Sequence, residues 1–203
     1  MPVRSLRNSH YGYHNAPDVH VSYASVPAYL RDLKQLVTTK KLSAAKEYYG
    51  QVRLRGGHGV LDVARTGIEY LELRDFDLNP FAPVGITAQQ LETVYDFLLL
   101  MLWLPAPSDV DQAVLTGTKL NDQVALEKPT QVTGLQSEGA WLTGQLDDMV
   151  TVLGLPAVTG LNPPLRAPVQ TLAAQWCAAC ALVPAQILAT TLAQGVAQRW
   201  GER

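Results

Sequence analysis

The sequence predicts an α+β fold, in which part of an antiparallel sheet carries the site and is followed by a helical C-terminal region. Before about residue 80, polar residues, glycines, histidines and tyrosines dominate, and short segments alternate in polarity as strands do. After that point, long segments repeat apolar residues at helical spacing. The turn sequence DLNPFAPVG lies at the change. We therefore divide the chain into regions 1–86 and 87–203.

The first region contains the strand candidates. Val3–Arg7 alternates and predicts a strand, and Ile68–Phe76, IEYLELRDF, is the strongest strand candidate in the sequence. Between them, Val26–Val37 has apolar residues near i, i+3, i+4 and i+7, which predicts a helix. Ser43–Tyr48 fits a short helical turn, and Gln51–Arg55 fits a short strand.

The second region predicts helices, each from its periodicity and its capping residues. Thr87 and Gln90 fit a capping box that opens a helix to about Trp103. Within it, the run FLLLMLWL is too short to span a bilayer, which needs about 20 residues, and predicts a buried helix segment. Four further helices are expected: from a cap at Ser108 and Asp111 to about Leu126, from Ser137 to Gly154 as the C-terminal glycine, over about Leu165–Ala179, and from about Pro184 to Trp200.

Charge and composition argue against several classes of function. The net charge is −2 and the pI is about 6.1, whereas nucleic-acid binders usually carry a basic excess. The opening residues PVRSLRNS lack the apolar stretch of a signal peptide. Two cysteines, Cys177 and Cys180, do not make a disulfide framework. We expect a cytoplasmic protein that binds neither nucleic acid nor membrane.

The strongest strand candidate also carries the residues best suited to chemistry. Alternation places Glu72 and Arg74 on one face, and Leu71 and Leu73 on the other, toward the core. A carboxylate is a suitable oxygen ligand for Mg²⁺, and a guanidinium pairs with phosphate oxygens. The pair therefore fits a nucleotide–metal site. It equally fits an ordinary solvent-facing strand with an ion pair between Glu72 and Arg74, and the residues alone leave both interpretations open.

Three motifs extend this pattern. The segment GIEYLELRDFDLNPFAPVGIT resembles the part of bacterial-type glutamate–cysteine ligases built around Y-[IL]-E-[VL]-R and D-[IL]-N-P-F-x-P-x-G. The opening SLRNSHYGYHN resembles the S-[IL]-R-x-S-x-x-G-Y segment of this family, and EYYGQVRLR resembles its E-x-Y-x-x-[IV]-R stretch. All three occur in the family's order, and the later helices match in pattern. The resemblance covers most of the chain and corresponds to the family's C-terminal half.

The resemblance implies a carboxylate–amine ligase fold, similar to glutamine synthetase, and roles for five residues. Glu72 would be a ligand of Mg²⁺ (or Mn²⁺), and Arg74 would be a catalytic residue that contacts the transferring phosphate of ATP. Arg7, Tyr13 and Tyr49 would hold the carboxylate of cysteine, since arginine pairs with carboxylates and tyrosine hydroxyls donate to them. We expect ATP to phosphorylate the γ-carboxylate of glutamate, after which the amine of cysteine attacks the acyl phosphate.

The resemblance also implies that something is missing. Family members use an N-terminal half that supplies further metal carboxylates and the glutamate pocket, and Met1 lies just before the SLR segment. We therefore expect a fragment, a split subunit or a truncated gene product that is a poor ligase or inactive alone and prone to self-association. If the chain is a split subunit, the N-terminal half would be a separate chain. The alternative is a non-catalytic subunit or remnant that binds cysteine and Mg-ATP only with such a partner.

Several weaker patterns are expected to be structural. The sequence RGGHG, residues 55–59, lacks the lysine of a phosphate loop and predicts a flexible glycine loop. Cys177 and Cys180 form a lone CxxC in an alanine-rich segment and predict small buried helix residues. Arg53 and Glu69 lie within the matched stretches, and we expect both to form structural ion pairs.

Overall fold

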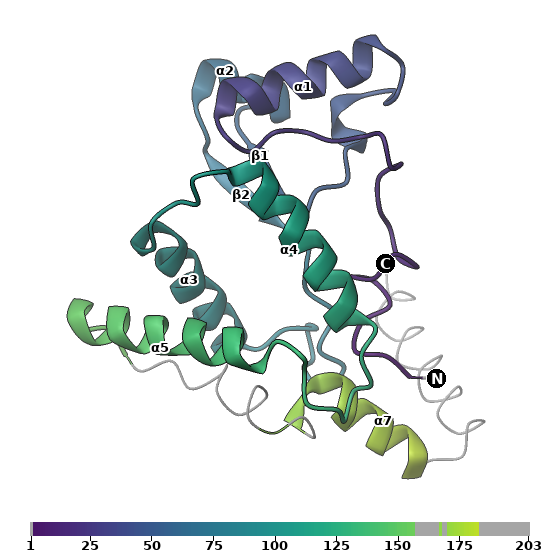
Figure 1. Ribbon diagram of the computed structural model, residues 1–203, viewed down its shortest axis with the longest axis vertical. Coiled ribbons are helices and arrows are strands. Elements are labelled where there is room, and N and C mark those ends of the chain that lie inside the picture. The colour runs from purple at the N-terminus through teal and green to yellow at the C-terminus, as the bar shows by residue number, and fades with distance from the viewer. Residues whose placement is uncertain (1, 157–166, 168–169, 183–203) are drawn as a thin grey trace. The chain divides into compact units, whose positions relative to one another are not determined.

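The computed structural model describes residues 2–156, 167 and 170–182 of the chain. The protein divides into two compact units (Figure 1). One unit comprises Ser5–Leu78 and Leu104–Leu126. The other comprises the described residues of Met1–Arg4, Asn79–Trp103 and Glu127–Arg203. All five residues implicated by the resemblance belong to the first of these units. The functional division at residue 86 remains a prediction.

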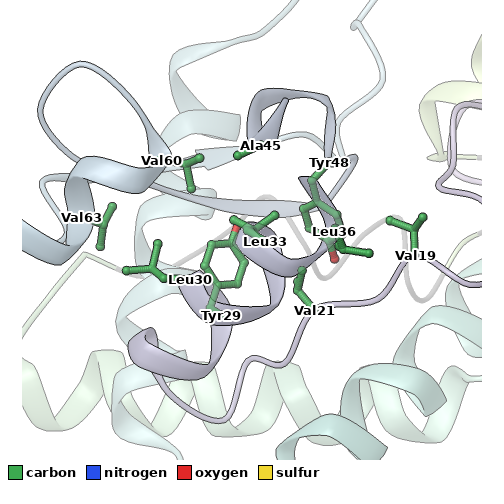
Figure 2. Packing of buried hydrophobic residues seen from close by; sticks show 10 residues of the cluster. All are labelled: Val19, Val21, Tyr29, Leu30, Leu33, Leu36, Ala45, Tyr48, Val60 and Val63. Carbon is green, nitrogen blue, oxygen red and sulfur yellow. The ribbon is translucent and has the colours of Figure 1, made fainter. Parts of the chain in front are cut away.

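Helix α1 (Val26–Thr38) organises the core of the first unit. The Ser25 hydroxyl accepts a hydrogen bond from the Ala28 amide at 3.2 Å and so caps the helix. One face of α1 is buried, with Leu33 fully enclosed. Figure 2 shows the cluster around this face, whose members are Val19, Val21, Tyr29, Leu30, Leu33, Leu36, Ala45, Tyr48, Val60 and Val63. The helix predicted from the apolar spacing is confirmed, and the 3₁₀ turn η1 (Ala45–Glu47) confirms the short turn.

Strands β1 (Val52–Arg55) and β2 (Tyr70–Leu73) pair antiparallel, and Arg53 lies opposite Glu72. The antiparallel sheet and the α+β class are therefore as predicted. Strand β2 is shorter than the predicted segment, and the expectation that Leu71 packs in the core is wrong, because this side chain is 41% exposed. Leu54, directly opposite on the same face of β1, does pack against the α1 cluster, so the core covers this face at β1 and leaves Leu71 partly exposed.

The glycine loop after β1 forms a tight turn. Gly56 and Gly59 pair as an isolated bridge, and the chain then enters the 3₁₀ turn η2 (Val60–Asp62) and the short helix α2 (Val63–Thr66). Gly56 must be small, because a Cβ atom there would lie 2.4 Å from the carbonyl oxygen of Gly67. The loop therefore brings the backbone of two segments together.

The predicted strand at Val3–Arg7 is wrong. Within the first unit, the Ser5 amide donates to the carbonyl of Ala125 at the end of helix α4 (Val110–Ala125), and within the second, the Arg4 amide donates to the carbonyl of Glu127. The backbone of this segment thus hydrogen-bonds to the end of a helix and to the turn after it, and not to a strand. Alternating polarity alone does not determine which backbone partner a segment finds.

The N-cap of helix α4 lies one residue later than predicted. Asp109, not Ser108, is the N-cap, and its carboxylate accepts a hydrogen bond from the Gln112 amide at 2.9 Å. Asp111, expected to complete the cap, instead accepts hydrogen bonds from Ser22 and Tyr23. When several neighbouring polar residues could each cap a helix, the backbone geometry decides which of them does so.

Helices α3 (Ala88–Trp103) and α5 (Gln136–Leu153) pack together in the second unit. The predicted capping box of α3 is confirmed, since Thr87 and Gln90 exchange hydrogen bonds of 2.9 and 3.2 Å. Gly154 ends α5 with a φ of 64°, as predicted. The expectation of a buried apolar run in α3 holds for Leu100 but is wrong for Leu102, which is 84% exposed.

Helix α7 (Leu172–Leu182) begins later than the predicted Leu165–Ala179 helix, part of which lies outside the described residues. The Thr171 hydroxyl accepts a hydrogen bond from the Ala174 amide at 3.2 Å, so the helix starts where a capping side chain is present. The predicted helix from Pro184 to Trp200 also lies outside the described residues. None of the helices that the structure describes is long and apolar enough to cross a membrane.

Candidate functional site

The candidate site lies on the charged face of the β1–β2 sheet, with Glu72 at its centre. One carboxylate oxygen, Oε1, lies 2.9 Å from Nε of Arg74 and 3.7 Å from Nη1 of Arg53. The other, Oε2, accepts hydrogen bonds from Nε of Arg55 at 2.7 Å and from Nη2 of the same side chain. Strand register produces this cluster, because it sets Arg53 opposite Glu72 and places Arg55 and Arg74 on the same face. We call these four residues the arginine–carboxylate cluster.

The cluster keeps Glu72 ionised. Partial burial would raise the pKa of this carboxyl, but the hydrogen bonds from Arg55 and the charges of Arg53 and Arg74 outweigh it and lower the pKa. Arg53 is itself only 3% exposed, and burial lowers the pKa of its guanidinium. Its Nη2 donates to the carbonyl of Lys46 at 2.6 Å. The structural ion pair expected for Arg53 is therefore confirmed.

Glu69 differs from Glu72 although it lies on the same segment. It is exposed, and within the described residues it forms no ion pair, so the pairing expected for it is wrong. Its alternation phase places it on the opposite side of the strand from the arginines. Glu69 therefore offers a matched control for experiments on Glu72.

Two tyrosines, Tyr49 and Tyr13, extend the site beyond Arg74. The guanidinium carbon of Arg74 lies 5.2 Å from the ring centroid of Tyr49, a cation–π geometry that orients the arginine. The ring of Tyr13 lies 5.9 Å from that of Tyr49. Tyr13 is 82% exposed, and neither hydroxyl has a hydrogen-bond partner among the described residues. Both hydroxyls are therefore available to a ligand.

Arg7 completes the group of five predicted residues. Its Nε and Nη2 donate to the backbone carbonyl of Arg74 at 3.1 and 2.8 Å, while its Nη1 has no partner in the described part of the chain. The structure thus brings Arg7, Tyr13, Tyr49, Glu72 and Arg74 into one continuous set of contacts. What each of them binds is not fixed by these contacts, so their roles remain predictions.

The loop that carries Arg7 and Tyr13 is held in place by asparagines. Asn15 donates to the carbonyl of Tyr49 at 2.6 Å and accepts from the amide of the same residue at 2.8 Å. Asn8 donates to the carbonyl of Asp75 at 2.7 Å, and Asn121 of α4 donates to the carbonyl of Asn8 at 2.8 Å. The loop is therefore attached to both the Tyr49 segment and the end of β2.

Sequence reasoning missed Arg55 and Asn15. Arg55 could have been found from strand alternation, since it shares a face with Arg53 in VRLR and that face had to meet Glu72. Asn15 gave no comparable indication, because its partner is a backbone 34 residues away. Side-chain contacts with distant backbone leave no periodic pattern in the sequence.

The metal-binding capacity of the site is limited. The described residues contain no group of three or more histidine, cysteine, aspartate or glutamate side chains that could hold an ion. Glu72 alone, ionised and partly exposed, supplies one carboxylate. This fits Mg²⁺ bound chiefly by substrate phosphates and water, because Mg²⁺ commonly takes only one or two protein carboxylates. The chemistry of the donor is therefore compatible with a shared ion.

The weaker sequence patterns do not join the site. A loop is confirmed at residues 56–59, whereas Arg55, which was expected in it, is the last residue of β1. The His58 amide donates to the Asp62 carboxylate at 2.8 Å, and the flexibility expected of the loop stays a prediction. Cys177 and Cys180 lie on α7 as half-buried free thiols, so they are helix residues as predicted but less buried than expected.

The fold is that of ligases of glutathione biosynthesis. A bifunctional glutathione synthetase from Pasteurella multocida matches 88% of this chain with a TM-score of 0.82 and 37% identity, over 24% of its own chain. A glutamate–cysteine ligase from Francisella tularensis, solved in complex with AMP, matches 96% of this chain with a TM-score of 0.84 over 47% of its own. Its identity is 20%, so this likeness supports the fold alone.

The family follows from sequence. Residues 38–124 match the model described as glutamate-cysteine ligase. A glutathione biosynthesis bifunctional protein of Enterococcus faecalis is 44% identical over 76% of this chain, and its counterpart in Streptococcus agalactiae is 48% identical over 64%. The resemblance inferred from the motifs is therefore confirmed, and residues 38–124 belong to the glutamate–cysteine ligase family. The chain spans about a fifth of the length of these curated relatives.

Proposed function

We propose that this chain supplies the cysteine pocket and part of the Mg-ATP site of a glutamate–cysteine ligase, the enzyme that joins the γ-carboxylate of glutamate to cysteine. The observation that carries the proposal is the unbroken contact series from Tyr13 through Tyr49 and Arg74 to Glu72. It joins residue types suited to an amino-acid carboxylate with residue types suited to a metal-bound phosphate.

The proposed roles follow from the hydrogen-bonding groups that each side chain leaves unpaired within the described residues. Arg7 keeps a free amino group, and the hydroxyls of Tyr13 and Tyr49 are unpaired within the described residues, so the three can hold the carboxylate of cysteine. Both terminal amino groups of Arg74 likewise lack partners there and can contact the transferring phosphate. Glu72 contributes an oxygen ligand to Mg²⁺, which neutralises phosphate charge when bound.

In this proposal the chain acts through positioning and charge neutralisation. The γ-carboxylate of glutamate attacks the terminal phosphorus of ATP, ADP leaves, and an acyl phosphate forms. The amine of cysteine then attacks the acyl carbon, loses a proton, and phosphate leaves. Arg74 offsets charge on the phosphoryl group in the first step, and the cysteine pocket holds the amine beside the carbonyl in the second. A cytoplasmic location is part of the proposal, because ATP and reduced cysteine are available there.

A second candidate is a non-catalytic subunit or remnant that binds cysteine and Mg-ATP only beside a partner. The observation that favours it is the single carboxylate of the arginine–carboxylate cluster, since the described residues contain no group of three metal-binding side chains. In both candidates the glutamate pocket and the remaining metal ligands belong to the N-terminal half of the family. The two candidates differ only in whether the completed assembly turns over.

The test is phosphate release from ATP in the presence of Mg²⁺, glutamate and cysteine. The purified chain is assayed alone and with an added N-terminal half taken from a family member. We expect turnover only with the added half, and a loss of about a hundredfold or more in Glu72→Ala. Glu69→Ala is the matched control, because it removes a carboxylate from the other face of the same segment.

The outcomes separate the candidates. Turnover that needs the added half supports the split site, and full activity of the chain alone contradicts it. Cysteine binding by calorimetry without turnover supports the non-catalytic subunit. Neither turnover nor binding under any condition would leave a structural remnant and refute the proposed roles.

A further inference from the structure

The arginine–carboxylate cluster carries more positive charge than its carboxylate balances. Arg53, Arg55 and Arg74 all contact Glu72, which leaves an excess of two positive charges on one small face. Like charges in close proximity repel each other, and a fold retains such an arrangement most easily when an anion joins it. The proposed function assigns phosphate binding to Arg74 alone and assigns no role to Arg55.

Burial distinguishes the three arginines. The Arg53 side chain is 4% exposed and donates to the carbonyl of Lys46, so it is part of the framework. The side chains of Arg55 and Arg74 are 20% and 31% exposed. Nη1 of Arg55 and both terminal amino groups of Arg74 have no partner among the described residues. These two guanidinium groups therefore present unpaired charged donors to solvent.

The two exposed arginines flank the same carboxylate from different oxygens. Arg55 of β1 contacts Oε2, and Arg74, directly after β2, contacts Oε1, so the two side chains approach Glu72 from two sides. A planar guanidinium pairs with two oxygens of a phosphate group. Two such groups on either side of one carboxylate suit a ligand with several phosphate oxygens spread along its length, rather than a single carboxylate.

We propose that Arg55 is a second phosphate-binding residue, that it acts together with Arg74, and that the ligand of this face is a polyphosphate chain. Glu72 is then the internal counter-ion with which the phosphates compete for both arginines. The proposal deepens the proposed function, on which the assignment of the polyphosphate to ATP rests. Anion binding itself needs neither glutamate, cysteine nor a partner chain, and can be measured on this chain alone.

The probe is inorganic tripolyphosphate, titrated into the full chain by calorimetry without divalent cations. We expect Arg55→Gln and Arg74→Gln each to weaken binding by about tenfold, the loss expected when one charge-assisted contact is removed. Arg65→Gln is the matched control, because Arg65 is exposed on α2 and forms no ion pair in the described part of the chain. It should bind tripolyphosphate as the wild type does.

The variant Glu72→Gln should change the affinity in the opposite direction to the arginine variants, which would not be expected if the cluster were only structural. Removing the competing carboxylate should strengthen binding of metal-free tripolyphosphate, with a steeper dependence on sodium chloride, because the site then carries one more uncompensated positive charge. Thermal unfolding of each variant, followed by circular dichroism, confirms that the compared proteins are folded.

Each outcome bears on the proposal. Wild-type binding by folded Arg55→Gln, or weaker binding by Glu72→Gln without metal, overturns it. If Arg74→Gln loses binding and Arg55→Gln does not, this inference fails while the proposed function stands. If Arg55→Gln loses binding but Glu72→Ala leaves ligase turnover intact, the polyphosphate face stands and the metal role of Glu72 in the proposed function fails.

Discussion

The α1 core and the arginine–carboxylate cluster share strand β1, yet they are built in opposite ways. On one side, Leu54 packs against an apolar cluster in which Leu33 is fully enclosed. On the other, Arg53 and Arg55 converge on one glutamate from β2. The core is held by burial, which is non-directional and depends on area removed from water. The cluster is held by directional contacts between charged groups.

The difference separates what stabilises the unit from what it can do. Burying an apolar side chain contributes about 2 kcal/mol wherever the packing is close. Charged pairs at a partly exposed face contribute little net stability, because desolvation and screening offset their attraction. Changes in the core should therefore affect folding, whereas changes in the cluster should affect binding.

The largest effect is expected in the core. Leu33→Ala removes a fully buried side chain and leaves a cavity, so we expect the free energy of unfolding to fall by about 3 kcal/mol. Urea denaturation followed by circular dichroism measures it. Leu61→Ala is the control, because Leu61 is 41% exposed and should lose less than about 1 kcal/mol. Equal losses would mean that the α1 core does not dominate stability.

Alkaline pH should weaken the same core. Burial raises the pKa values of Tyr23, Tyr29 and Tyr48 in the folded protein above their unfolded value of about 10. A raised folded pKa gives stability that is complete below the unfolded pKa and is lost as pH rises above it. Each such tyrosine should lower the free energy of unfolding as the pH rises above 10 toward its own folded pKa, because it ionises first in the unfolded chain.

The variant Tyr48→Phe isolates this effect from other titrating groups. Its loss of stability between neutral pH and pH 11 should be smaller than that of the wild type, because one tyrosine no longer ionises on unfolding. Urea midpoints at matched pH values measure the difference. An identical pH dependence in both proteins would show that Tyr48 ionises as readily folded as unfolded.

The site framework should respond to Asn15. This side chain makes hydrogen bonds of 2.6 and 2.8 Å with the carbonyl and amide of Tyr49, so Asn15→Ala should cost about 1–2 kcal/mol of stability. Asn15→Asp keeps the acceptor but sets a carboxylate oxygen against the Tyr49 carbonyl, so it should cost at least as much as Asn15→Ala. Thermal unfolding measures both. Wild-type stability of Asn15→Asp would contradict the assignment of the donor bond to the Asn15 amide nitrogen.

The smallest effect is expected at a hydroxyl. The Tyr29 hydroxyl is buried without a hydrogen-bond partner among the described residues, whereas that of Tyr23 donates to the carbonyl of Val52 at 2.9 Å. Tyr29→Phe should therefore be neutral or stabilising by up to about 1 kcal/mol, and Tyr23→Phe should destabilise by about 1 kcal/mol. Denaturant midpoints compare them, and the reverse order would show that Tyr29 has a bonded hydroxyl.

The two regions also differ in how far the sequence predicts them. Helix α1 was predictable because its buried face repeats within one segment, and the capping box at Thr87 was predictable because both partners lie three residues apart. Glu72 and Arg74 were identified as candidates from alternation and from the family motif. Their surroundings were not, because Arg55 and Asn15 act on groups far along the chain.

The failures have the same origin. Val3–Arg7 alternates like a strand but hydrogen-bonds at the end of α4. Leu71 was placed in the core, although the core reaches Leu54 opposite it and leaves Leu71 partly exposed. Local pattern predicts local structure, while the choice between a sheet, a helix end and solvent as a neighbour depends on tertiary contacts. The role of a residue is harder still to predict, because it depends on a ligand as well as on the tertiary contacts.

The central claim is that Glu72 and Arg74 act together in a glutamate–cysteine ligase site. Its most direct test is Mg²⁺- and ATP-dependent phosphate release by the chain with an added N-terminal half, comparing Glu72→Ala, Arg74→Lys and Glu69→Ala. We predict losses of about a hundredfold or more for the first two and wild-type turnover for the third. Wild-type turnover by Glu72→Ala, or equal losses in all three variants, would contradict the claim.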